Sequence, residues 1–541
     1  MVVLGINGGF RPGYQDVSAC LAADGKVLFA LEEERLSRIK FSAGKLPFLA
    51  VREALSYMRL KIQDVDYIGF HGSTWEPEIE ERIKSYFVNH LGFCPPIRRY
   101  HHHDCHSASA YYASGFDEAL VITLDNSGDG ISTQISEAKN GNVKLLERFA
   151  RPNSYGTFYS LITQYCGFVK DSDEYKLMGL APYGDSSKFT FDWLIDFQNG
   201  ELKLNTDYII SIPAKAPSPH RDEMIFNQKF LDKMGKPRRL PKSEYAQFYK
   251  DVAASAQLHL ETTVLKMLKY YVGKTGLRKI CMGGGVALNC VMNQKIMNAD
   301  FVDALFVQPA SSDAGISLGA AWLAGLEKGI IPVKTTDTFL GNEYSIEQIK
   351  SALDGCNLKY RETNEPDEVA AGLIAKNKVI GWFQGRMEYG PRALGNRSIL
   401  ANPAVAEMKD IVNQKVKFRD SFRPFCPSVL EEDAPKYFVG KQTISPYMTI
   451  TYDVRKEMRA KIPAVTHVDG TARIQTVNAS ENALYYSLLK KLKEKTGHGV
   501  VLNTSFNLSH EPIVCTPRAA IASFYASGLD ALVIGNFVIE K

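Results

Sequence analysis

Short apolar runs that end in glycine or aspartate recur along the first part of the chain. Residues 2–9 read VVLGINGG, residues 119–130 read ALVITLDNSGDG, and residues 278–293 read RKICMGGGVALNCVMN. Each pattern predicts a buried strand that ends in a Gly-rich turn, and the third continues into a helix. A turn at Ala23–Gly25 lies between two further strand-like runs and predicts a hairpin. The recurrence predicts a duplicated α/β domain with a nucleotide cleft between its halves.

The glycine turns have two interpretations. Glycines between a strand and a helix let backbone N–H groups approach a phosphate, which suits a nucleotide site. The alternative is an ordinary β-meander in a protein core. Before the third turn, residues 245–271 carry apolar side chains at helical spacing, among them Val252, Leu260, Val264 and Leu268. This spacing predicts one long amphipathic helix.

The character of the sequence changes near residue 345, where we place a domain boundary. Residues 324–345 mix Gly, Pro and Thr after a small-residue helix and are the best linker candidate. Beyond them, arginines cluster with Gly, Pro, Ser and Asn in segments of loop composition. The stretch 211–244 is polar, interrupted by Pro and rich in basic residues, and we interpret it as a solvated insertion. A chain of 541 residues is too long for one compact core, so two domains are expected.

Composition narrows the class of protein. Hydrophobic residues make up 45% of the chain and charged residues 23%, which is ordinary for a globular protein. The net charge of +4 permits contact with phosphates or nucleic acid without requiring it. The nine cysteines contain no CxxC pair, so free thiols in a reducing compartment are expected. Because the sequence has neither a signal-peptide pattern nor an apolar segment near the roughly 20 residues of a membrane span, we predict a cytoplasmic protein without membrane contact.

Four of the eleven histidines lie within six residues, in the segment HHHDCHSASAYY at 101–112. His102 and His106 are four residues apart, so on a helix both rings would lie on one face, within reach of one metal ion. Asp125 follows an apolar strand, and Asp313 lies in a Ser/Gly-rich loop before a helix. Two His and two Asp would suit Fe(II), Mn(II) or Zn(II). The alternative is a polar helix face with hydrogen-bonded histidines.

Four arginines in the second part of the chain, Arg392, Arg397, Arg423 and Arg473, stand beside Gly, Pro or Ser rather than in helical Glu/Lys patterns. Arginine binds a phosphate or a planar acyl group through two parallel hydrogen bonds. Each alone could form a surface ion pair, but the four together favour an anion site. The chain has no GxSxG motif, no P-loop and no zinc ribbon, so no covalent nucleophile is indicated.

Ten motifs, spread in order over essentially the whole chain, resemble those of the O-carbamoyltransferases that act on nodulation factors and on antibiotics such as tobramycin. They read EEERLSR, HHDCHSASAYY, LDNSGDG, DEYKLMGLAPYG, GGGVALN, SSDAGISLGAA, GPRALGNRSI, FRPFCPS, HVDGTARIQTV and NTSFNLSHEPIV. The resemblance implies an α/β fold in two parts. Residues 1–345 would be an actin/hexokinase-like domain with the metal and nucleotide site, and residues 346–541 a YrdC-like domain that forms carbamoyladenylate.

The resemblance also implies a reaction and its participants. Carbamoyl phosphate and ATP, the latter with Mg, would give carbamoyladenylate, whose carbamoyl group an acceptor hydroxyl of a sugar or natural product then takes, with release of AMP. A mixed anhydride with AMP supplies the good leaving group that carbamate itself lacks. Fe(II) is the expected resident metal, with another divalent ion as the alternative. The resemblance leaves a homodimer open.

Residue roles follow from the same motifs. The implied metal ligands are His102, His106, Asp125 and Asp313. The implied nucleotide contacts are Ser127, Gly128, Lys176, Gly179, Gly284, Gly285 and Asn289. The implied carbamoyl phosphate and adenylate site comprises Arg392, Lys417, Arg423, Met448, Arg473, Asn503 and Ser505, of which Arg392 and Arg423 are candidate catalytic residues. Lys40 is a further catalytic candidate near the acceptor.

One position departs from the family. Many relatives carry His-Asp-Ala-Ser-Ala near the N-terminus, where this chain reads QDVSA with Gln15 in place of the histidine. Glutamine does not titrate near neutral pH, so a general base at this position is not expected. Asp16 or a metal-linked group is the candidate replacement. The change also leaves room for a different kind of acceptor.

Three alternatives stay open at this stage. The same chemistry could act on the hydroxymethyl group of a modified cytosine in DNA, which would have to be flipped out or single-stranded. A kinase or ATPase with the actin/hexokinase-like fold would instead release ADP. A non-catalytic nucleic-acid-binding protein, suggested by the basic balance alone, would bind DNA or RNA in a salt-dependent way without turning over nucleotide.

Overall fold

A computed structural model gives the structure of the protein and describes residues 1–10, 16–210, 223–335 and 337–541. The chain forms two compact units. The first comprises Met1–Leu28, Ala43–Pro47 and Arg59–Thr336, and the second Phe29–Ser42, Phe48–Met58 and Asp337–Lys541. Two short stretches of the N-terminal part, including Lys40, therefore belong to the second unit, which a linear division at residue 345 does not convey.

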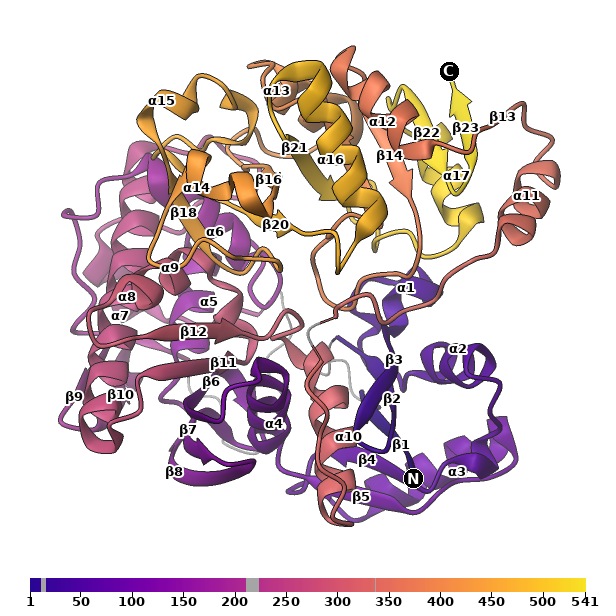
Figure 1. Cartoon of the computed structure of the whole chain (residues 1–541). Helices are drawn as coiled ribbons and strands as arrows, with labels where there is room; N and C mark the ends of the chain where they lie inside the picture. The colour runs from indigo at the N-terminus through magenta and orange to yellow at the C-terminus, as the bar shows by residue number, and fades with distance from the viewer. Residues whose placement is uncertain (11–15, 211–222, 336) are drawn as a thin grey trace. The chain divides into compact units, whose positions relative to one another are not determined.

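The first unit is built on two five-stranded sheets with the same strand order (Figure 1). One has the order β3-β2-β1-β4-β5, with β1 (Val2–Asn7), β2 (Ser18–Ala23), β3 (Lys26–Glu32), β4 (Tyr67–His71) and β5 (Ile97–Tyr100). The other has the order β8-β7-β6-β11-β12, with β6 (Glu118–Gly128), β7 (Ile131–Lys139), β8 (Asn142–Ala150), β11 (Lys279–Gly283) and β12 (Ala304–Val307). β1 is antiparallel to β2 and parallel to β4, and β6 is antiparallel to β7 and parallel to β11. This repetition confirms the predicted duplication and the actin/hexokinase-like α/β fold.

Two helices position the histidines and one aspartate. α4 (His102–Ser114) packs against β6 and β11, and α10 (Ile316–Leu326) covers β1, β2 and β4 and packs against α4 (Figure 1). The predicted long helix is α8 (Gln247–Thr275), which packs against α5 (Tyr155–Tyr165), α6 (Glu174–Leu180) and α9 (Cys290–Asn298). Further α-helices and strands of this unit are α3 (Glu78–Leu91), α7 (Gln228–Met234), β9 (Ile195–Gln198) and β10 (Glu201–Leu204).

The second unit has one eight-stranded mixed sheet of order β13-β23-β22-β14-β15-β21-β16-β20. The strands are β13 (Arg361–Glu362), β14 (Ile380–Phe383), β15 (Arg397–Ala401), β16 (Cys426–Leu430), β20 (Gln475–Val477), β21 (Val500–Ser505), β22 (Ala531–Ile534) and β23 (Phe537–Glu540). Helices α12 (Pro366–Ala375) and α16 (Ala483–Thr496) pack on each other and share a buried apolar core with the sheet, which includes Trp382 and Leu489. Burial of this apolar surface is the main stabilising contribution here.

Smaller elements complete the second unit. A three-stranded sheet has the order β17-β18-β19, formed by β17 (Phe438–Val439), β18 (Thr451–Val454) and β19 (Thr471–Arg473). The helices are α1 (Glu33–Ser37), α2 (Phe48–Tyr57), α11 (Ile346–Asp354), α13 (Met408–Val412), α14 (Ala434–Tyr437), α15 (Lys456–Arg459) and α17 (Pro517–Tyr525). A π-helical turn at Asn413–Lys417 continues α13.

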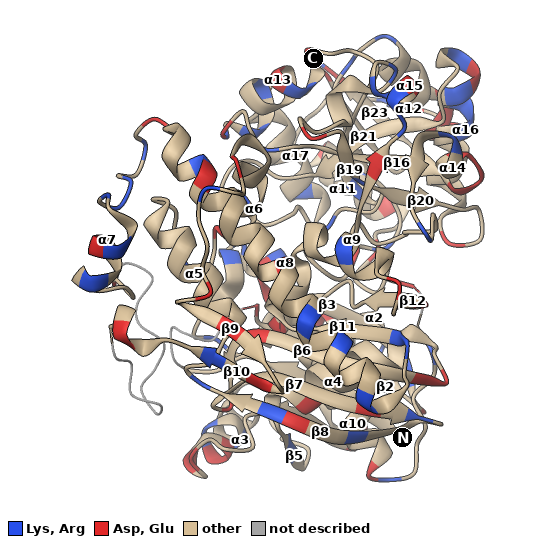
Figure 2. Ribbon diagram, turned by 90° about the vertical axis from the view of Figure 1, so that its left-hand side faces the viewer, with Lys and Arg blue, Asp and Glu red and all other residues tan. Residues whose placement is uncertain are grey.

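Several expectations from composition can be compared with the structure. The nine cysteines, all within the described ranges, form no disulfide bond with one another. No helix in the described ranges combines the length and apolar character that a membrane span requires. Figure 2 shows basic and acidic residues interspersed along β8 and α7. α7 lies in the described part of the basic stretch 211–244, whose residues 211–222 fall outside the described ranges.

Candidate metal centre and adenylate site

Four side chains from three segments of the first unit converge at one point. His102 and His106 lie one turn apart on α4, Asp125 lies on β6, and Asp313 precedes α10. One ligand atom from each lies within 4.8 Å of all the others. The register of β6 with β7 shifts between Leu124 and Gly128, and such an irregularity changes the direction of a side chain within a strand. The four residues that the sequence analysis proposed as metal ligands thus lie close together in the structure.

The four histidine–aspartate distances are close to those between ligands of one shared ion. Asp125 Oδ2 lies 3.1 Å from His102 Nε2 and 3.4 Å from His106 Nε2. Asp313 Oδ1 lies 3.6 Å from both of these nitrogens. Two donors that each lie about 2.1 Å from one metal ion are separated by roughly 3–3.5 Å. His106 Nε2 is buried and makes no hydrogen bond within the described structure, so a ligand atom is left available.

Burial and charge define the electrostatics of the cluster. The side chain of His106 is 1% exposed, whereas that of Asp313 is 30% exposed, so the cluster is open on the aspartate side. Burial opposes a charge on His106, but the two carboxylates outweigh it and raise the pKa of His106 to about 9. Burial likewise opposes a charge on Asp125, and the neighbouring His102 and His106 overcome it and hold the pKa of Asp125 well below its usual value. The pair of carboxylates thus demands a nearby positive charge, which a divalent cation would supply.

The other two histidines of the cluster have different partners. His101 is the N-cap of α4, and its ring accepts a hydrogen bond from the backbone N–H of His103. The His103 ring is buried between Thr123 Oγ1, at 2.6 Å, and the carbonyl of Ile131, at 3.0 Å. Both contacts hold α4 against the second sheet. Of the four histidines, His101 and His103 therefore have structural contacts, and His102 and His106 are candidate ligands.

Gly128, predicted as a nucleotide contact, packs directly on a candidate ligand. A Cβ atom at this position would lie 2.0 Å from His102 Cδ2, well inside van der Waals contact. A side chain here would displace the His102 ring. The absence of a side chain at residue 128 is therefore required by the close approach of the imidazole.

The other predicted nucleotide contacts lie at one edge of the second sheet, on α6 and at the start of α9. β6 and β11 are parallel neighbours, so Ser127, near the end of β6, and the pair Gly284–Gly285, which follows β11, lie at the same edge. A Cβ at Gly285 would lie 3.3 Å from Asp125 Oδ1. Asn289 is the N-cap of α9 and exchanges two hydrogen bonds with the amide of Gln257. Lys176 and Gly179 lie on α6, where Lys176 pairs with Asp173 at 2.9 Å.

A partly buried polar network, which the sequence analysis did not identify, links β6 to α5 and α6. Asn126 Nδ2 donates to Asp171 Oδ1 at 2.9 Å, and Ser160 Oγ donates to Glu174 Oε1 at 2.7 Å. Burial, followed by the charge of Asp171, raises the pKa of Glu174 to about 7. The available sequence signal was a pair of carboxylates beside the apolar helix YKLMGL. The network fixes the residue that follows Asp125.

The seven residues predicted to bind carbamoyl phosphate and the adenylate all belong to the second unit. Asn503 lies opposite Cys426 in the pairing of β21 with β16, and Cys426 Sγ accepts hydrogen bonds from Arg473 at 3.0 and 3.2 Å. Met448 packs with Cys426 and Leu394 in one apolar cluster. These contacts bring Met448, Arg473 and Asn503 together.

The other residues of the predicted carbamoyl phosphate and adenylate site are linked to this group or to each other by further contacts. Asn503 Nδ2 donates to the carbonyl of Ala393, the residue after Arg392, at 3.2 Å, while Asn503 Oδ1 is buried without a hydrogen-bond partner among the described residues. Lys417 Nζ donates to Ser505 and to Asn507. Burial, followed by the positive charges of Arg419, Arg423 and Lys40, holds the pKa of Lys417 well below its usual value. Arg423 and Lys40 therefore lie near Lys417.

Three further residues singled out in the sequence, Asp16, Gln15 and Arg397, lie outside these two clusters of contacts or outside the described residues. Asp16 has a positive φ of 51°, and its carbonyl accepts a hydrogen bond from Asn7 Nδ2 at 2.9 Å. Gln15, the departure from the family pattern, lies outside the described residues. Arg397, grouped with the anion-binding arginines, is fully buried and donates to the carbonyls of Gln384, Gly385 and Asn396. Its guanidinium is thus committed to the backbone of its own unit.

Comparison with known proteins identifies the class. The carbamoyltransferase N-terminus family matches residues 90–322, and the carbamoyltransferase C-terminus family matches residues 371–541. The chain belongs to the carbamoyltransferase family, and it is a transferase.

Individual relatives extend over most of the chain. It is 35% identical to the nodulation protein NolNO of Sinorhizobium fredii, over 100% of this chain and 83% of that protein. It is 38% identical to the nodulation protein NolO of Bradyrhizobium diazoefficiens, over 81% of this chain and 78% of the relative. An uncharacterised Synechocystis protein is 36% identical over 98% of this chain and 96% of its own length.

Solved structures are more distant. HypF in its phosphate- and nucleotide-bound form has a TM-score of 0.35 at 13% identity, over 62% of this chain and 56% of that one. A ROK hexokinase from Thermus thermophilus has a TM-score of 0.32 at 14% identity, over 61% of this chain and 100% of that one. The fold assignment therefore rests on the repeated strand order.

Proposed function

We propose that the protein is an ATP-dependent O-carbamoyltransferase with two reaction sites. The C-terminal part, residues 346–541, converts carbamoyl phosphate and ATP to carbamoyladenylate, and the N-terminal part, residues 1–345, transfers the carbamoyl group to an acceptor hydroxyl. The observation that carries the proposal is the cluster of two histidines and two aspartates in a chain of the carbamoyltransferase family.

The bonds made and broken balance in two stages. In the first, carbamoyl phosphate, water and ATP give carbamoyladenylate, phosphate and pyrophosphate. In the second, the acceptor oxygen bonds to the carbamoyl carbon, the carbon–oxygen bond to AMP breaks, and the hydroxyl proton is lost. Arg392, Arg423 and Arg473 offset the negative charge of two phosphate-bearing substrates, which otherwise repel each other. The buried, unpartnered Asn503 Oδ1 offers an acceptor for the N–H groups of a carbamoyl amide.

The metal site is assigned to His102, His106, Asp125 and Asp313, with Fe(II) as the proposed ion. Imidazole and carboxylate ligands suit Fe(II), Mn(II) and Zn(II), so metal analysis of the purified protein distinguishes them. A divalent cation bound there would neutralise phosphate oxygens of the nucleotide. The open side at Asp313 leaves room for such a ligand.

The acceptor is proposed to be a hydroxyl of a sugar or natural product. Incubation with carbamoyl phosphate, ATP and a panel of acceptors, followed by mass spectrometry, should show a carbamoyl mass increment on one class. DNA with hydroxymethylcytosine belongs in the panel, because a gain there and not on the small molecules would establish the alternative acceptor.

The reaction class is tested by its nucleotide products. The proposal requires AMP and pyrophosphate in amounts that depend on carbamoyl phosphate. Release of ADP without dependence on carbamoyl phosphate would identify a kinase or ATPase instead. Absence of carbamoyl-phosphate-dependent exchange of labelled pyrophosphate into ATP would contradict carbamoyladenylate formation.

A further inference from the structure

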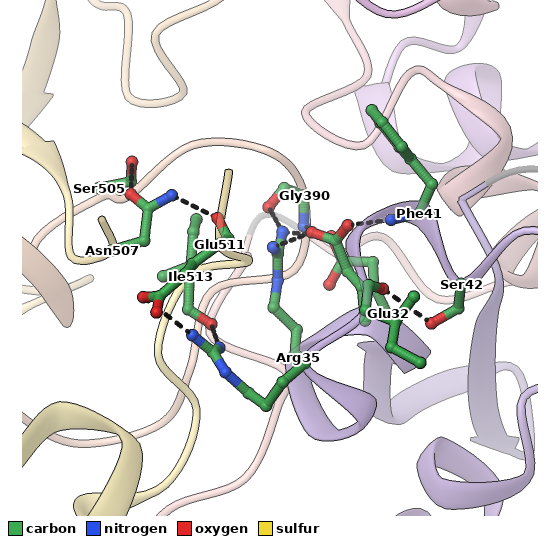
Figure 3. A network of polar contacts seen from close by, with 12 residues as sticks. Glu32, Arg35, Phe41, Ser42, Gly390, Ser505, Asn507, Glu511 and Ile513 are labelled. Carbon is green, nitrogen blue, oxygen red and sulfur yellow. Dashed lines mark hydrogen bonds and ion pairs between the residues drawn. The ribbon is translucent and has the colours of Figure 1, made fainter. Parts of the chain in front are cut away.

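The segment EEERLSR at 32–38 supplies an ion pair that clamps one glycine in the second unit (Figure 3). Glu32 Oε1 accepts a hydrogen bond from the backbone N–H of Gly390 at 2.9 Å. Arg35 Nη2 donates to the carbonyl of the same glycine at 2.8 Å and to Glu32 Oε1 at 3.1 Å. Both peptide groups that flank Gly390 are thereby held by one buried pair.

The clamped glycine lies two residues before Arg392, a predicted adenylate-site residue. Gly390 has a φ of 120°, a conformation that residues with a side chain rarely adopt. Pro391 follows it, and the proline ring restricts its own φ to near −65°. The connection from the clamp to Arg392 is therefore short and stiff.

The chain is fixed on the other side of Arg392 as well. Glu388 Oε1 accepts hydrogen bonds from the backbone N–H groups of Leu394 and Asn396, both at 2.8 Å. The carbonyl of Ala393 accepts one from Asn503 Nδ2. Arg392 thus stands between two anchored backbone segments, and the Glu32–Arg35 pair is the anchor on its N-terminal side.

The Glu32–Arg35 ion pair is buried, and its burial indicates what the pair contributes. Glu32 is 4% exposed and Arg35 3% exposed. A buried ion pair gains little net stability, because desolvation of both charges offsets their attraction, and apolar residues of similar volume stabilise as well. What the pair adds over an apolar contact is a defined direction for two peptide groups. Defined geometry of supporting contacts is what a reactive arginine requires.

We propose that Glu32 and Arg35 are positioning residues for Arg392 in the adenylate-forming step. The proposal rests on the proposed function of the second unit. The same segment also contacts the loop at residues 511–513. Arg38 Nη1 donates to the carbonyl of Ile513 at 2.7 Å, and Arg38 pairs with Glu511 at 3.7 Å. Asn507, which binds Lys417, donates to the carbonyl of Glu511 at 2.6 Å (Figure 3).

The test uses the full-length protein and the acceptor-independent exchange of pyrophosphate into ATP in the presence of carbamoyl phosphate. Glu32→Gln and Arg35→Lys should each lower kcat/KM for exchange about tenfold or more. Asp433→Asn is the matched control, because Asp433 is a buried carboxylate of the same unit that pairs with Lys436 and Lys493 rather than with Gly390. It should lower the thermal midpoint at least as much and change kcat/KM less than about twofold.

A double-mutant cycle separates positioning from general destabilisation. In an Arg392→Lys background, Glu32→Gln should add little further loss, because its effect passes through Arg392. Multiplicative losses, or normal exchange in both single variants, would overturn the positioning role and leave the proposed function intact. Lack of exchange by the unmodified protein would instead contradict the proposed function. If Glu32→Gln does not fold, Arg35→Lys, which keeps the charge, provides the same cycle.

Discussion

At the scale of single residues, the two carboxylates and two histidines of the candidate metal centre are predictable from residue type and helical spacing, whereas the partners of the other two histidines are not. His102 and His103 are neighbours in sequence, yet one faces Asp125 and the other a threonine. Helical spacing selects His102 and His106 as the one i, i+4 pair among these four histidines, whereas the contacts of His103 depend on which face of the helix packs on the sheet.

Substitution of a candidate ligand should remove the metal. Asp313→Asn and His106→Ala are expected to weaken metal binding by at least about tenfold, since one donor of four is lost. Inductively coupled plasma mass spectrometry of the dialysed proteins measures this directly. His101→Asn is the control, because asparagine keeps an N-cap acceptor for α4 and should leave the metal content unchanged. Equal metal content in all four proteins would contradict the assigned ligand set.

Gly128→Ala should disturb the same centre through sterics alone. Its Cβ would lie 2.0 Å from His102 Cδ2, so the ring must shift, at a cost of about 1–3 kcal/mol. We expect a lower free energy of unfolding in urea and a lower metal content. Gly273→Ala, in α8 with nothing within 4 Å of the added Cβ, should be neutral or stabilising. Matching behaviour of the two variants would show that residue 128 does not contact His102.

At the scale of elements, strands and helices with strong apolar patterns are predicted well. The runs at 119–130 and 278–293 correspond to β6 and to β11 with α9, and the long helix predicted at 245–271 is α8. The network between β6, α5 and α6 could not be predicted, because Asp171 and Glu174 read as exposed helix-start acids. Only the packing of α6 on α8 places Glu174 in a buried environment.

This burial predicts a pH dependence of stability. A carboxyl whose pKa rises to about 7 on folding stabilises the protein below its unfolded value of about 4.5, and that stability is lost as the pH rises through 7. Each pKa unit corresponds to about 1.4 kcal/mol. The free energy of unfolding of Glu174→Gln, relative to that of the unmodified protein, should therefore be higher at pH 8 than at pH 5. Urea denaturation at both pH values gives the difference, and a constant difference would contradict the burial of this carboxyl.

At the scale of the whole molecule, the division of labour between the two units is the main proposal. Residues 29–42 belong to the second unit although they precede most of the first, because EEERLSR contacts the loops at 390 and 511–513. A linear reading of the sequence assigns this motif to the N-terminal domain. Its partners are distant in sequence, so no local pattern indicates them.

The two sites should fail independently. Asp313→Asn should keep carbamoyl-phosphate-dependent pyrophosphate exchange while it loses carbamoyl transfer to the acceptor. Arg473→Ala should lower the rate of pyrophosphate exchange at least about 100-fold, as expected for the removal of one charge-stabilising donor. Carbamoyl transfer to the acceptor should fall with it. Radiolabelled exchange and mass spectrometry of the acceptor measure the two activities in the same preparations. Loss of exchange in Asp313→Asn would show that the metal site serves adenylate formation as well.

The sequence alone determined the duplicated α/β pattern, the long helix and the residue types of the metal and anion sites, because these depend on local periodicity and on side-chain chemistry. The tertiary structure decided which of these residues meet. The strand order that brings β6 beside β11, the packing that turns His103 away from His102, and the ion pair that joins residue 35 to residue 390 all depend on contacts between distant segments. Such contacts are fixed by the burial of the whole core, which no short stretch of sequence specifies.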